Sequence, residues 1–274
     1  MIKKILILLL IIITAFSIIL FGCGRVEPTA EVTIETEENE SGEEIQKESE
    51  ETQEEAIEEE PVQVEAKPRA QEGEVTFTTE DGIDINGNIF GSGNRWVILS
   101  HMRPTTQTSW SDFARYLADN GYIVLTYDFR GYGKSGGSQD ISNIDKDLEA
   151  ALDFVIRHDA EKIFLMGASM GGTASLVVSS RQTADGVISF SSPTEIDSLS
   201  AIDKVGNIDA PKLFIASKGD ENAAESANTL FNASPEPKEI EILDGSAHGT
   251  FIFEKEPDNA EILSQIVLDF LNSN

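Results

Sequence analysis

One serine in this sequence of 274 residues lies in a setting that suits nucleophilic chemistry. Ser169 is the middle residue of 167–171, which reads GASMG and has the pattern G-x-S-x-G. An apolar run at 162–166 precedes it, and a helical stretch at 170–181 follows. On a sharp strand-to-helix turn a serine hydroxyl stands exposed, and the two glycines let strand and helix pass closely. We therefore predict that Ser169 is a nucleophile.

The same turn would also stabilise negative charge. The predicted helix begins at Met170, so its first N–H groups have no partner within the helix. They would face the oxygen that becomes an anion when a serine attacks a carbonyl carbon. The motif and its flanking elements together favour acyl-transfer chemistry.

Apolar runs alternate with amphipathic stretches from residue 74 to the end of the sequence. Residues 74–79 and 83–90 flank an Asp-Gly pair and predict a hairpin. Helical spacing marks 110–117, 148–155, 170–181 and 257–271. The other predicted strands are apolar runs at 95–100, 122–128, 162–166, 186–190, 212–217 and 238–243. This alternation predicts an α/β fold with a mainly parallel sheet and helices on both faces.

On these grounds residues 74–274 resemble the α/β-hydrolase family. Residues 100–103 (SHMR) follow a buried strand, where the family often has an oxyanion loop. Residues 128–136 (DFRGYGKSG) are similar to a loop of capless hydrolases and of the serine aminopeptidase and lysophospholipase branch. In that loop Arg130 and Ser135 are expected to brace the chain rather than take part in chemistry.

The resemblance implies a Ser-His-Asp triad in the chain order of this family. Asp220 follows the strand at 212–217 and is the expected acid, and His248 follows the last strand and is the expected base. The resemblance also implies an oxyanion hole formed by the N–H of Met170 and by that of Met102 or Arg103. Met102 stands where the family usually has glycine, so the choice between these two stays open.

Several other residues compete for these roles. His101 lies in the oxyanion-loop position, where we expect it to shape the turn, and His158 lies near the end of a predicted helix. Glu195 is an alternative acid, because some hydrolases carry the acid on an earlier strand. Acidic side chains also occur near Asp220 in the sequence, at Glu221, Asp209 and Asp244.

Only residues 192–209 separate the strand at 186–190 from the next strand region. In this family a lid is usually inserted there, and this segment has room for a short helix but not for a cap domain. We therefore expect an open site, which disfavours long-chain lipase activity and cap-dependent epoxide or haloalkane chemistry. The sequence shows no cluster of metal ligands, and no cofactor is expected.

The first 22 residues predict export. Lys3 and Lys4 precede an uncharged, largely apolar run at 5–21, the layout of a signal peptide. The run ends in Leu20-Phe21-Gly22-Cys23, which resembles a bacterial lipoprotein signal with Cys23 as the lipidated residue. The alternative is an uncleaved membrane helix, since the run approaches the ~20 residues that span a bilayer. Either arrangement leaves the rest of the chain outside the cytoplasmic membrane.

Charge divides the remainder of the chain. Residues 23–72 hold 18 of the 49 acidic residues and few aromatic ones, so we expect an acidic, disordered tether rather than an acidic binding tail. Residues 73–274 form the predicted hydrolase domain. With a net charge of −29 and no basic face, nucleic-acid binding is excluded. A single Cys excludes a disulfide framework and any multi-Cys metal site.

Together these features predict a serine hydrolase that is tethered by lipid to the outer face of a bacterial cell membrane. An esterase acting on small acyl esters is the first interpretation. A serine peptidase or an acyl-transferase would use the same triad, because acyl-enzyme chemistry does not choose the leaving group. A non-catalytic scaffold or binding lipoprotein is the alternative from another class, since a fold does not by itself decide function.

Overall fold

The computed structural model describes residues 69–274, which contain a central sheet of eight strands. The predicted signal peptide, Cys23 and the predicted tether as far as residue 68 lie outside the described residues. The strands of the sheet are β1 (Gly73–Thr78), β2 (Asp84–Phe90), β3 (Arg95–Ser100), β4 (Ile123–Tyr127), β5 (Lys162–Ala168), β6 (Gly186–Phe190), β9 (Lys212–Ser217) and β10 (Lys238–Leu243).

The sheet is antiparallel at one edge and parallel elsewhere. Its strand order is β1-β2-β4-β3-β5-β6-β9-β10. β1 pairs antiparallel with β2, and β2 with β4, while every other neighbouring pair is parallel. Parallel strands need crossover connections, which here carry the helices. The carboxyl ends of the parallel strands therefore meet at one edge, where ligands bind in sheets of this kind.

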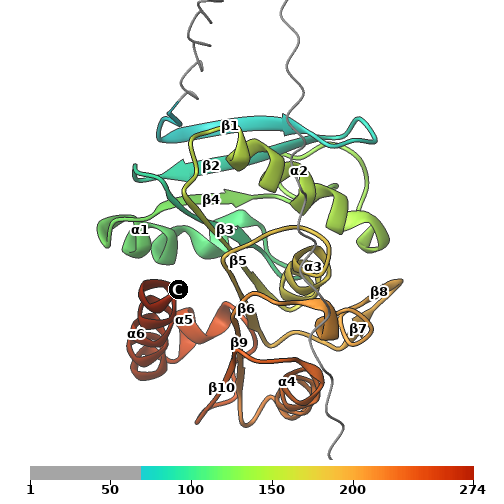
Figure 1. Cartoon of the computed structure of the whole chain (residues 1–274), viewed down its shortest axis with the longest axis vertical. Coiled ribbons are helices and arrows are strands. Elements are labelled where there is room, and N and C mark those ends of the chain that lie inside the picture. Colours follow the sequence, from blue (N-terminus) through green and yellow to red (C-terminus); the bar gives the residue numbers. More distant parts are fainter. Residues whose placement is uncertain (1–68) are drawn as a thin grey trace, which may run out of the picture. The chain divides into compact units, whose positions relative to one another are not determined.

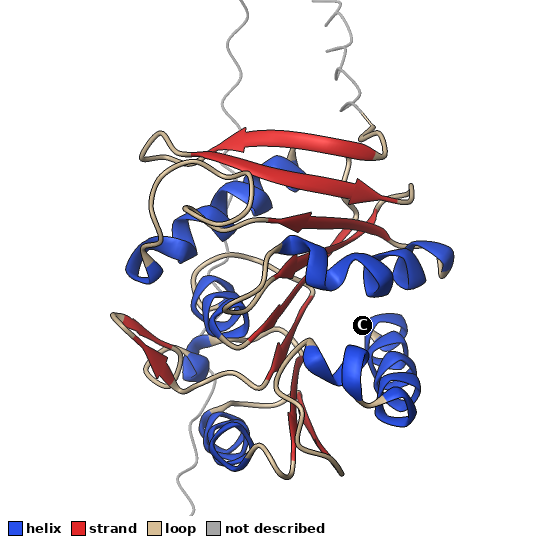
Figure 2. Cartoon of the chain, turned by 180° about the vertical axis from the view of Figure 1, so that it is seen from behind, coloured by secondary structure: helices blue, strands red, loops and turns tan. Residues whose placement is uncertain are grey.

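Helices cover both faces of this sheet. Figures 1 and 2 show α1, α5 and α6 on one face and α2, α3 and α4 on the other. Within the described residues the α-helices are α1 (Ser111–Asp119), α2 (Ile144–Ile156), α3 (Met170–Ser179), α4 (Glu221–Ala233), α5 (Phe251–Lys255) and α6 (Pro257–Ser273). Short 3-10 turns at Gln107–Trp110 and Ile141–Asn143 lead into α1 and α2.

The central strands are apolar on both faces because each face packs against helices. In β3, Trp96 and Ile98 belong to the core under α2 and α3. Val97 and Leu99 belong to the second core, under α1 and α6. Side chains alternate between faces along a strand, so two buried faces require a continuous apolar run. This is why the sequence of β3 does not alternate between apolar and polar residues.

The predicted fold class is confirmed: a mainly parallel sheet carries helices on both faces. The expectation of no cap domain also agrees with the described residues. The segment between β6 and β9 holds a small hairpin of β7 (Glu195–Ile196) and β8 (Leu199–Ser200), followed by a 3-10 turn at Val205–Asn207. A hairpin thus occupies the segment in which the sequence leaves room for a short helix. Among residues 69–274, no helix is both long enough and apolar enough to cross a membrane.

Candidate active site

Ser169 lies on a strained turn at the carboxyl end of β5. Its φ of 49° and ψ of −117° place a non-glycine residue in the left-handed half of backbone space. A strained serine of this kind is typical of functional sites. The turn is tight: a Cβ on Gly167 would collide with the backbone of Gly171, so glycine is required where β5 meets α3. The Ser169 N–H donates to the Phe190 carbonyl of β6 at 2.8 Å, which ties the turn to the neighbouring strand.

Asp220 and His248 are in direct contact. Asp220 ends the loop after β9 and precedes α4, and His248 lies in the loop after β10. The Nδ1 of His248 lies 2.6 Å from Asp220 Oδ2, and the two side chains are 38% and 18% exposed. A carboxylate at Nδ1 fixes the tautomer in which the other ring nitrogen, Nε2, can accept a proton. In the described residues no other carboxylate hydrogen-bonds to His248.

The His248 loop packs against the strand end that carries Ser169. A Cβ on Gly249 would lie 3.2 Å from Ala168 Cβ and 2.6 Å from Met102 Sδ. Within residues 69–274, the Ser169 hydroxyl makes no hydrogen bond, and none joins it to His248. In many free hydrolases this contact tightens only when substrate binds. The structure therefore joins Asp220 to His248 and brings their loop to the Ser169 turn.

Backbone donors surround this turn. The N–H of Met170, at the start of α3, has no acceptor among the described residues, and neither do those of Met102 and Arg103. A Cβ on Gly171 would collide with the Ser100 and His101 carbonyls, so the loop after β3 presses against the first turn of α3. Met102 is fully buried, whereas Arg103 is exposed. Both predicted donors of that loop therefore remain candidates beside Met170.

His101 has a structural role, as predicted. It is fully buried, its Nε2 accepts from the Phe129 N–H at 3.0 Å, and its Nδ1 donates to the Met102 carbonyl at 2.9 Å. Burial lowers the pKa of this imidazole, which keeps it neutral. Both ring nitrogens are occupied by the backbone, so His101 has no lone pair left to act as a base. His158 is likewise bonded through Nδ1 to the Phe154 carbonyl.

None of the alternative acids, Asp209 included, hydrogen-bonds to His248 among the described residues. Glu195 is on the β7–β8 hairpin, where it accepts a hydrogen bond from Ser200 at 3.2 Å. Asp244 lies 3.9 Å from Lys218 in an exposed ion pair, and Glu221 is the first residue of α4. Asp220 is therefore the acid whose position agrees with the predicted role.

Ser191 is a site residue that the sequence did not reveal. It follows β6, is 1% exposed and has a φ of 48°, again in the left-handed region. Its hydroxyl accepts a hydrogen bond from the Gly249 N–H at 3.0 Å, and its own N–H donates to the Ile215 carbonyl. Ser191 thus anchors the residue that follows His248. The sequence feature that could have pointed to Ser191 is its position at the carboxyl end of a predicted parallel strand, where ligands bind in such sheets.

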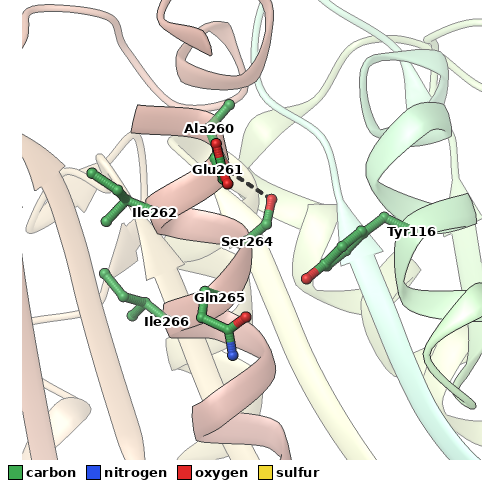
Figure 3. A pocket seen from close by; sticks show the side chains of 7 residues that line it. All are labelled: Tyr116, Ala260, Glu261, Ile262, Ser264, Gln265 and Ile266. Atoms are coloured by element: carbon green, nitrogen blue, oxygen red, sulfur yellow. Dashed lines mark hydrogen bonds between the residues drawn. The ribbon is translucent and has the colours of Figure 1, made fainter. Parts of the chain in front are cut away.

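A separate groove is lined by residues of α6 and by Tyr116 of α1 (Figure 3). Its lining residues on α6 include Ile262, which is 51% exposed, and Ser264. The Ser264 hydroxyl donates to the Ala260 carbonyl at 2.7 Å, so it already has a partner. None of the predicted catalytic residues lines this groove. We do not assign it to the site.

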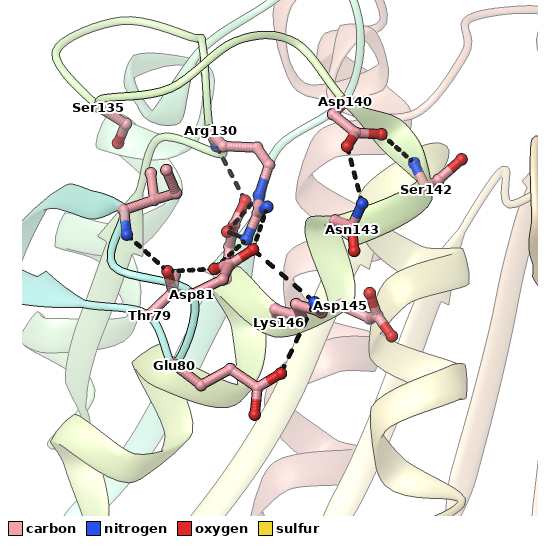
Figure 4. Close-up of polar contacts among 12 residues, drawn as sticks. Thr79, Glu80, Asp81, Arg130, Ser135, Asp140, Ser142, Asn143, Asp145 and Lys146 are labelled. Atoms are coloured by element: carbon pink, nitrogen blue, oxygen red, sulfur yellow. Dashed lines mark hydrogen bonds and ion pairs between the residues drawn. The ribbon is translucent and has the colours of Figure 1, made fainter.

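Arg130 is the centre of a buried ion network in the loop after β4, which we call the Arg130 network (Figure 4). It is 5% exposed and contacts Asp147 of α2 at 2.7 Å and Asp81 of the β1–β2 turn at 2.8 Å. Burial would lower the pKa of Arg130, but hydrogen bonds to both carboxylates outweigh it and raise that pKa. Burial raises the pKa of Asp147 to about 6, against the opposing effect of Arg130. The contacts with Asp147 and Asp81 hold Arg130 in place, so Arg130 braces the loop as predicted.

Ser135 also braces this loop. Its hydroxyl donates to the Asp128 carbonyl at 2.6 Å and accepts from the Asn86 N–H at 2.9 Å. The Asp128 carboxylate accepts from the backbone and side-chain amides of Gln107 and from the Lys134 N–H. The loop after β4 is thereby fixed to the 3-10 turn that precedes α1, which follows the predicted oxyanion loop in sequence.

Solved structures with the same architecture cover most of this chain. The Pyrococcus furiosus esterase Pf2001 matches with a TM-score of 0.65 and 20% identity, over 74% of this chain and 92% of that one. The alpha/beta hydrolase GrgF from Penicillium matches with a TM-score of 0.64 and 19% identity, over 74% and 99%. The chain has the α/β-hydrolase fold. With sequence identities of 19% and 20%, these two matches show that the chain shares the fold of the α/β hydrolases, and they show nothing about its activity.

Sequence comparisons cover less of the chain. The model of the family described as serine aminopeptidase, S33, matches residues 93–205. A 2-hydroxy-6-oxononadienedioate/2-hydroxy-6-oxononatrienedioate hydrolase of Escherichia coli is 36% identical over 34% of this chain and 33% of its own length. The non-heme chloroperoxidase CPO-A1 of Kitasatospora aureofaciens is 32% identical over 35% and 34%. The chain thus spans about a third of the length of these curated relatives.

Proposed function

We propose that this protein is a serine hydrolase that cleaves acyl esters, with Ser169 as nucleophile, His248 as base and Asp220 as the acid that orients it. The observation that carries the proposal is the 2.6 Å hydrogen bond between His248 Nδ1 and Asp220 Oδ2, beside a strained serine at the end of β5. The three residues follow different strands, and the sheet brings those strand ends to one edge. The esterases among the structural neighbours support the same reading.

In the proposed reaction the Ser169 oxygen attacks the ester carbonyl carbon and passes its proton to His248 Nε2. The tetrahedral intermediate collapses, the bond to the alcohol oxygen breaks, and His248 returns the proton to that oxygen. The acyl group remains on Ser169. A water molecule then attacks the acyl-enzyme with His248 again as base, which releases the carboxylic acid and restores the serine.

Asp220 stabilises the imidazolium that forms during each attack and keeps the proton-accepting nitrogen facing Ser169. The oxyanion would be received by the Met170 N–H and by the N–H of Met102 or Arg103, which have no acceptor within residues 69–274. Loss of one such donor typically costs about 10²–10³ in rate. Because backbone donors cannot be removed by a side-chain change, this part of the site is insensitive to simple substitutions.

A peptidase is the second candidate function, and one observation favours it. The family model that matches residues 93–205 describes serine aminopeptidases. The proposed triad would cleave an amide by the same steps, with the amine in place of the alcohol. Activity on amino-terminal peptide amides, compared with esters of the same acyl group, separates the two.

The deciding experiment is active-site labelling. The full chain is treated with a fluorophosphonate probe, beside its Ser169→Ala variant. Labelling of the wild type alone is the expected result. If the wild type is not labelled, the hydrolase proposal fails and a non-catalytic binding or scaffold protein becomes the better interpretation. A labelled protein is then assayed on esters of increasing acyl length and on peptide amides.

We further propose that the chain is exported and anchored to the outer face of the cell membrane by a lipid on Cys23. The support is the sequence alone, in which the single cysteine ends a signal-like segment. Metabolic labelling with a palmitate analogue, followed by fractionation of cells, tests this proposal. The wild type is expected to be labelled and found with membranes, and Cys23→Ala to lose the label. Label retained by the variant would contradict the proposal.

A further inference from the structure

The segment that carries the proposed base has no regular structure of its own. Residues 244–250, which we call the base loop, connect β10 to α5 and contain two glycines with positive φ, Gly245 at 133° and Gly249 at 54°. Within the described residues, the only hydrogen bond of the His248 side chain is the one to Asp220. Glycines give a loop a wide choice of backbone angles, so the position of His248 depends on the contacts that fix the backbone around it.

A glutamate holds the backbone immediately before His248. Glu256 Oε1 accepts from the Ser246 N–H at 2.8 Å and from the Ala247 N–H at 2.9 Å. The carboxylate lies directly against the base loop, because a Cβ on Gly245 would collide with it. Hydrogen bonds to a carboxylate are roughly twice as strong as those between neutral groups, so this contact restrains the loop.

Glu256 is itself held in place. It is the residue between α5 and α6, two helices that lie on one face of the sheet (Figure 1). Its N–H donates to the Ile252 carbonyl of α5 at 3.1 Å, and its carbonyl accepts from the Ala260 N–H of α6 at 2.8 Å. Its Oε2 accepts from the Asn259 side chain at 2.7 Å. Backbone and carboxylate are therefore both fixed, and they tie the base loop to the two helices.

The contacts of Glu256 favour its ionised form. Hydrogen bonds from the Ser246 N–H, and then from the Asn259 side chain, lower the pKa of this carboxyl. All the donors to the carboxylate within the described residues are backbone N–H groups and an amide, with no lysine or arginine among them. The interaction is therefore a directed hydrogen-bond contact and not an ion pair.

Two serines hold the same loop from other segments of the chain. Ser217, fully buried at the end of β9, donates to the Ala247 carbonyl at 2.7 Å. Ala247 therefore has both of its backbone groups bonded to side chains. After the base, the Gly249 N–H donates to Ser191. The backbone on both sides of His248 is thus fixed by side chains from three separate segments.

We infer that Glu256 is a positioning residue of the proposed hydrolase, whose carboxylate fixes the base loop so that His248 Nε2 is directed at the Ser169 hydroxyl. Among the described residues Glu256 makes no hydrogen bond to the triad side chains, and it acts through the backbone of Ser246 and Ala247. A displacement of ~1 Å at a reacting group can cost about 10²-fold in rate. The inference rests on the proposed function and adds a residue outside the triad on which the rate depends.

Three substitutions of Glu256 in the full chain separate the contact from the charge. Glu256→Gln keeps an oxygen at the same reach and loses the charge. Glu256→Asp keeps the charge but is shorter by one methylene group, so it no longer reaches both N–H groups. Glu256→Leu has neither. The matched control is Glu261→Leu, the same change on α6 at an exposed carboxylate that makes no hydrogen bond within residues 69–274.

The measured quantities are KM and kcat for an activated acetate ester, with kcat expressed per site titrated by a fluorophosphonate so that unfolded molecules do not count. Glu256→Leu should lower kcat about 10²-fold at an unchanged KM, because the base is displaced while ester binding is not disturbed. Glu256→Asp should lower kcat about tenfold, the effect of one lost hydrogen bond. Glu256→Gln should stay within about fivefold of the wild type, since its amide oxygen accepts from both N–H groups. Glu261→Leu should leave kcat unchanged.

NMR spectroscopy reports on the base directly. In a chain with isotope-labelled histidine, the Nδ1 proton of His248 lies in a short hydrogen bond to Asp220 and gives a far-downfield signal. This signal should shift or broaden in Glu256→Leu and keep its position in Glu256→Gln. His101 and His158, whose Nδ1 atoms bond to backbone carbonyls, are internal references whose signals should not move.

A Glu256→Leu variant with the wild-type kcat per titrated site would overturn the inference, even if its melting temperature is lower. A Glu256→Asp variant more active than Glu256→Gln would also overturn it, because the charge and not the contact would then matter. If Glu256→Leu yields no titratable site, the comparison of these two variants decides. If the wild type is labelled at Ser169 and its rate does not depend on Glu256, only the positioning role fails. If the wild type is not labelled at all, the proposed function fails, and the inference with it.

Discussion

The Arg130 network and the proposed active site belong to the same sheet domain, and they differ in whether their polar groups have hydrogen-bond or ion-pair partners. In the Arg130 network the buried guanidinium meets two carboxylates within 2.8 Å. In the proposed active site the Met170 N–H has no partner among the described residues, and Ser169 and Ser191 have strained backbones. Saturated polar groups hold a fold together, whereas unsaturated and strained ones are available for binding and chemistry. The contrast separates a structural region from a reactive one.

The largest effect is expected at the reactive region. Ser169→Ala should lower kcat/KM for an activated acetate ester by roughly 10⁴–10⁶-fold, because the nucleophile of a triad acts as a unit with its base. Its melting temperature should stay near that of the wild type, since the hydroxyl has no hydrogen bond within residues 69–274 to lose. Ester hydrolysis by stopped assay and calorimetry measure the two quantities. Activity retained by the variant would remove Ser169 from the mechanism.

Substitutions in the Arg130 network should lower stability. Arg130→Met leaves Asp147, which is fully buried, without its counter-charge, and should reduce the free energy of unfolding by about 3–5 kcal/mol. The double variant Arg130→Met with Asp147→Leu should recover much of that loss, because no buried charge is then left unpaired. Urea unfolding measures both. If the double variant is as unstable as the single one, the unpaired charge of Asp147 is not the cause of the lost stability.

Ser191 tests whether the strained backbone beside the proposed base contributes to the rate. Ser191→Gly removes the acceptor for the Gly249 N–H and at the same time relieves the positive φ. We expect kcat to fall about tenfold, in line with the loss of one buried hydrogen bond beside the base, while stability changes little. An unchanged rate would limit Ser191 to packing.

The smallest effect is expected for Asp81, through the stability that the protein loses at acidic pH. Hydrogen bonds from Arg130, and then from Thr79, hold the pKa of Asp81 well below its ordinary value of 3.8. The stabilisation is therefore fully present above that value and is lost as the pH falls below it. The carboxylate is 34% exposed, so solvent weakens the interaction. Melting temperatures from pH 7 down to pH 3 should fall less steeply for Asp81→Asn than for the wild type.

Much of the architecture could be predicted because the pattern of buried residues is local. The strands at 95–100, 186–190 and 212–217 coincide with β3, β6 and β9, since a strand covered on both faces must be a continuous apolar run. The strand at 238–243 coincides with β10, an edge strand in which isoleucines alternate with charged residues. Asp220 and His248 could be predicted because the acid and the base follow the nucleophile in a fixed order in the family that the Ser169 motif indicates. That order follows from the order of the strands along the chain, which the alternation of strands and helices implies.

The missed features depend on contacts between distant segments. α4 buries Ala223, Ala227 and Leu230, and two of these are alanines, so its sequence has a weak apolar stripe. The five-residue α5 is too short to show a helical period. The role of Ser191 depends on a hydrogen bond to a residue 58 positions away. No local pattern shows that a serine will adopt a positive φ.

The order of strands in the sheet also has a consequence for how activity appears during folding. His248 follows β10, an edge strand that pairs only with β9, while Ser169 follows β5 near the centre. Contacts between segments so far apart in sequence form late, because a long loop must close before they are gained. Helical circular dichroism should therefore return before esterase activity after dilution from urea. The regain of activity would then report when the His248 loop reaches the Ser169 turn.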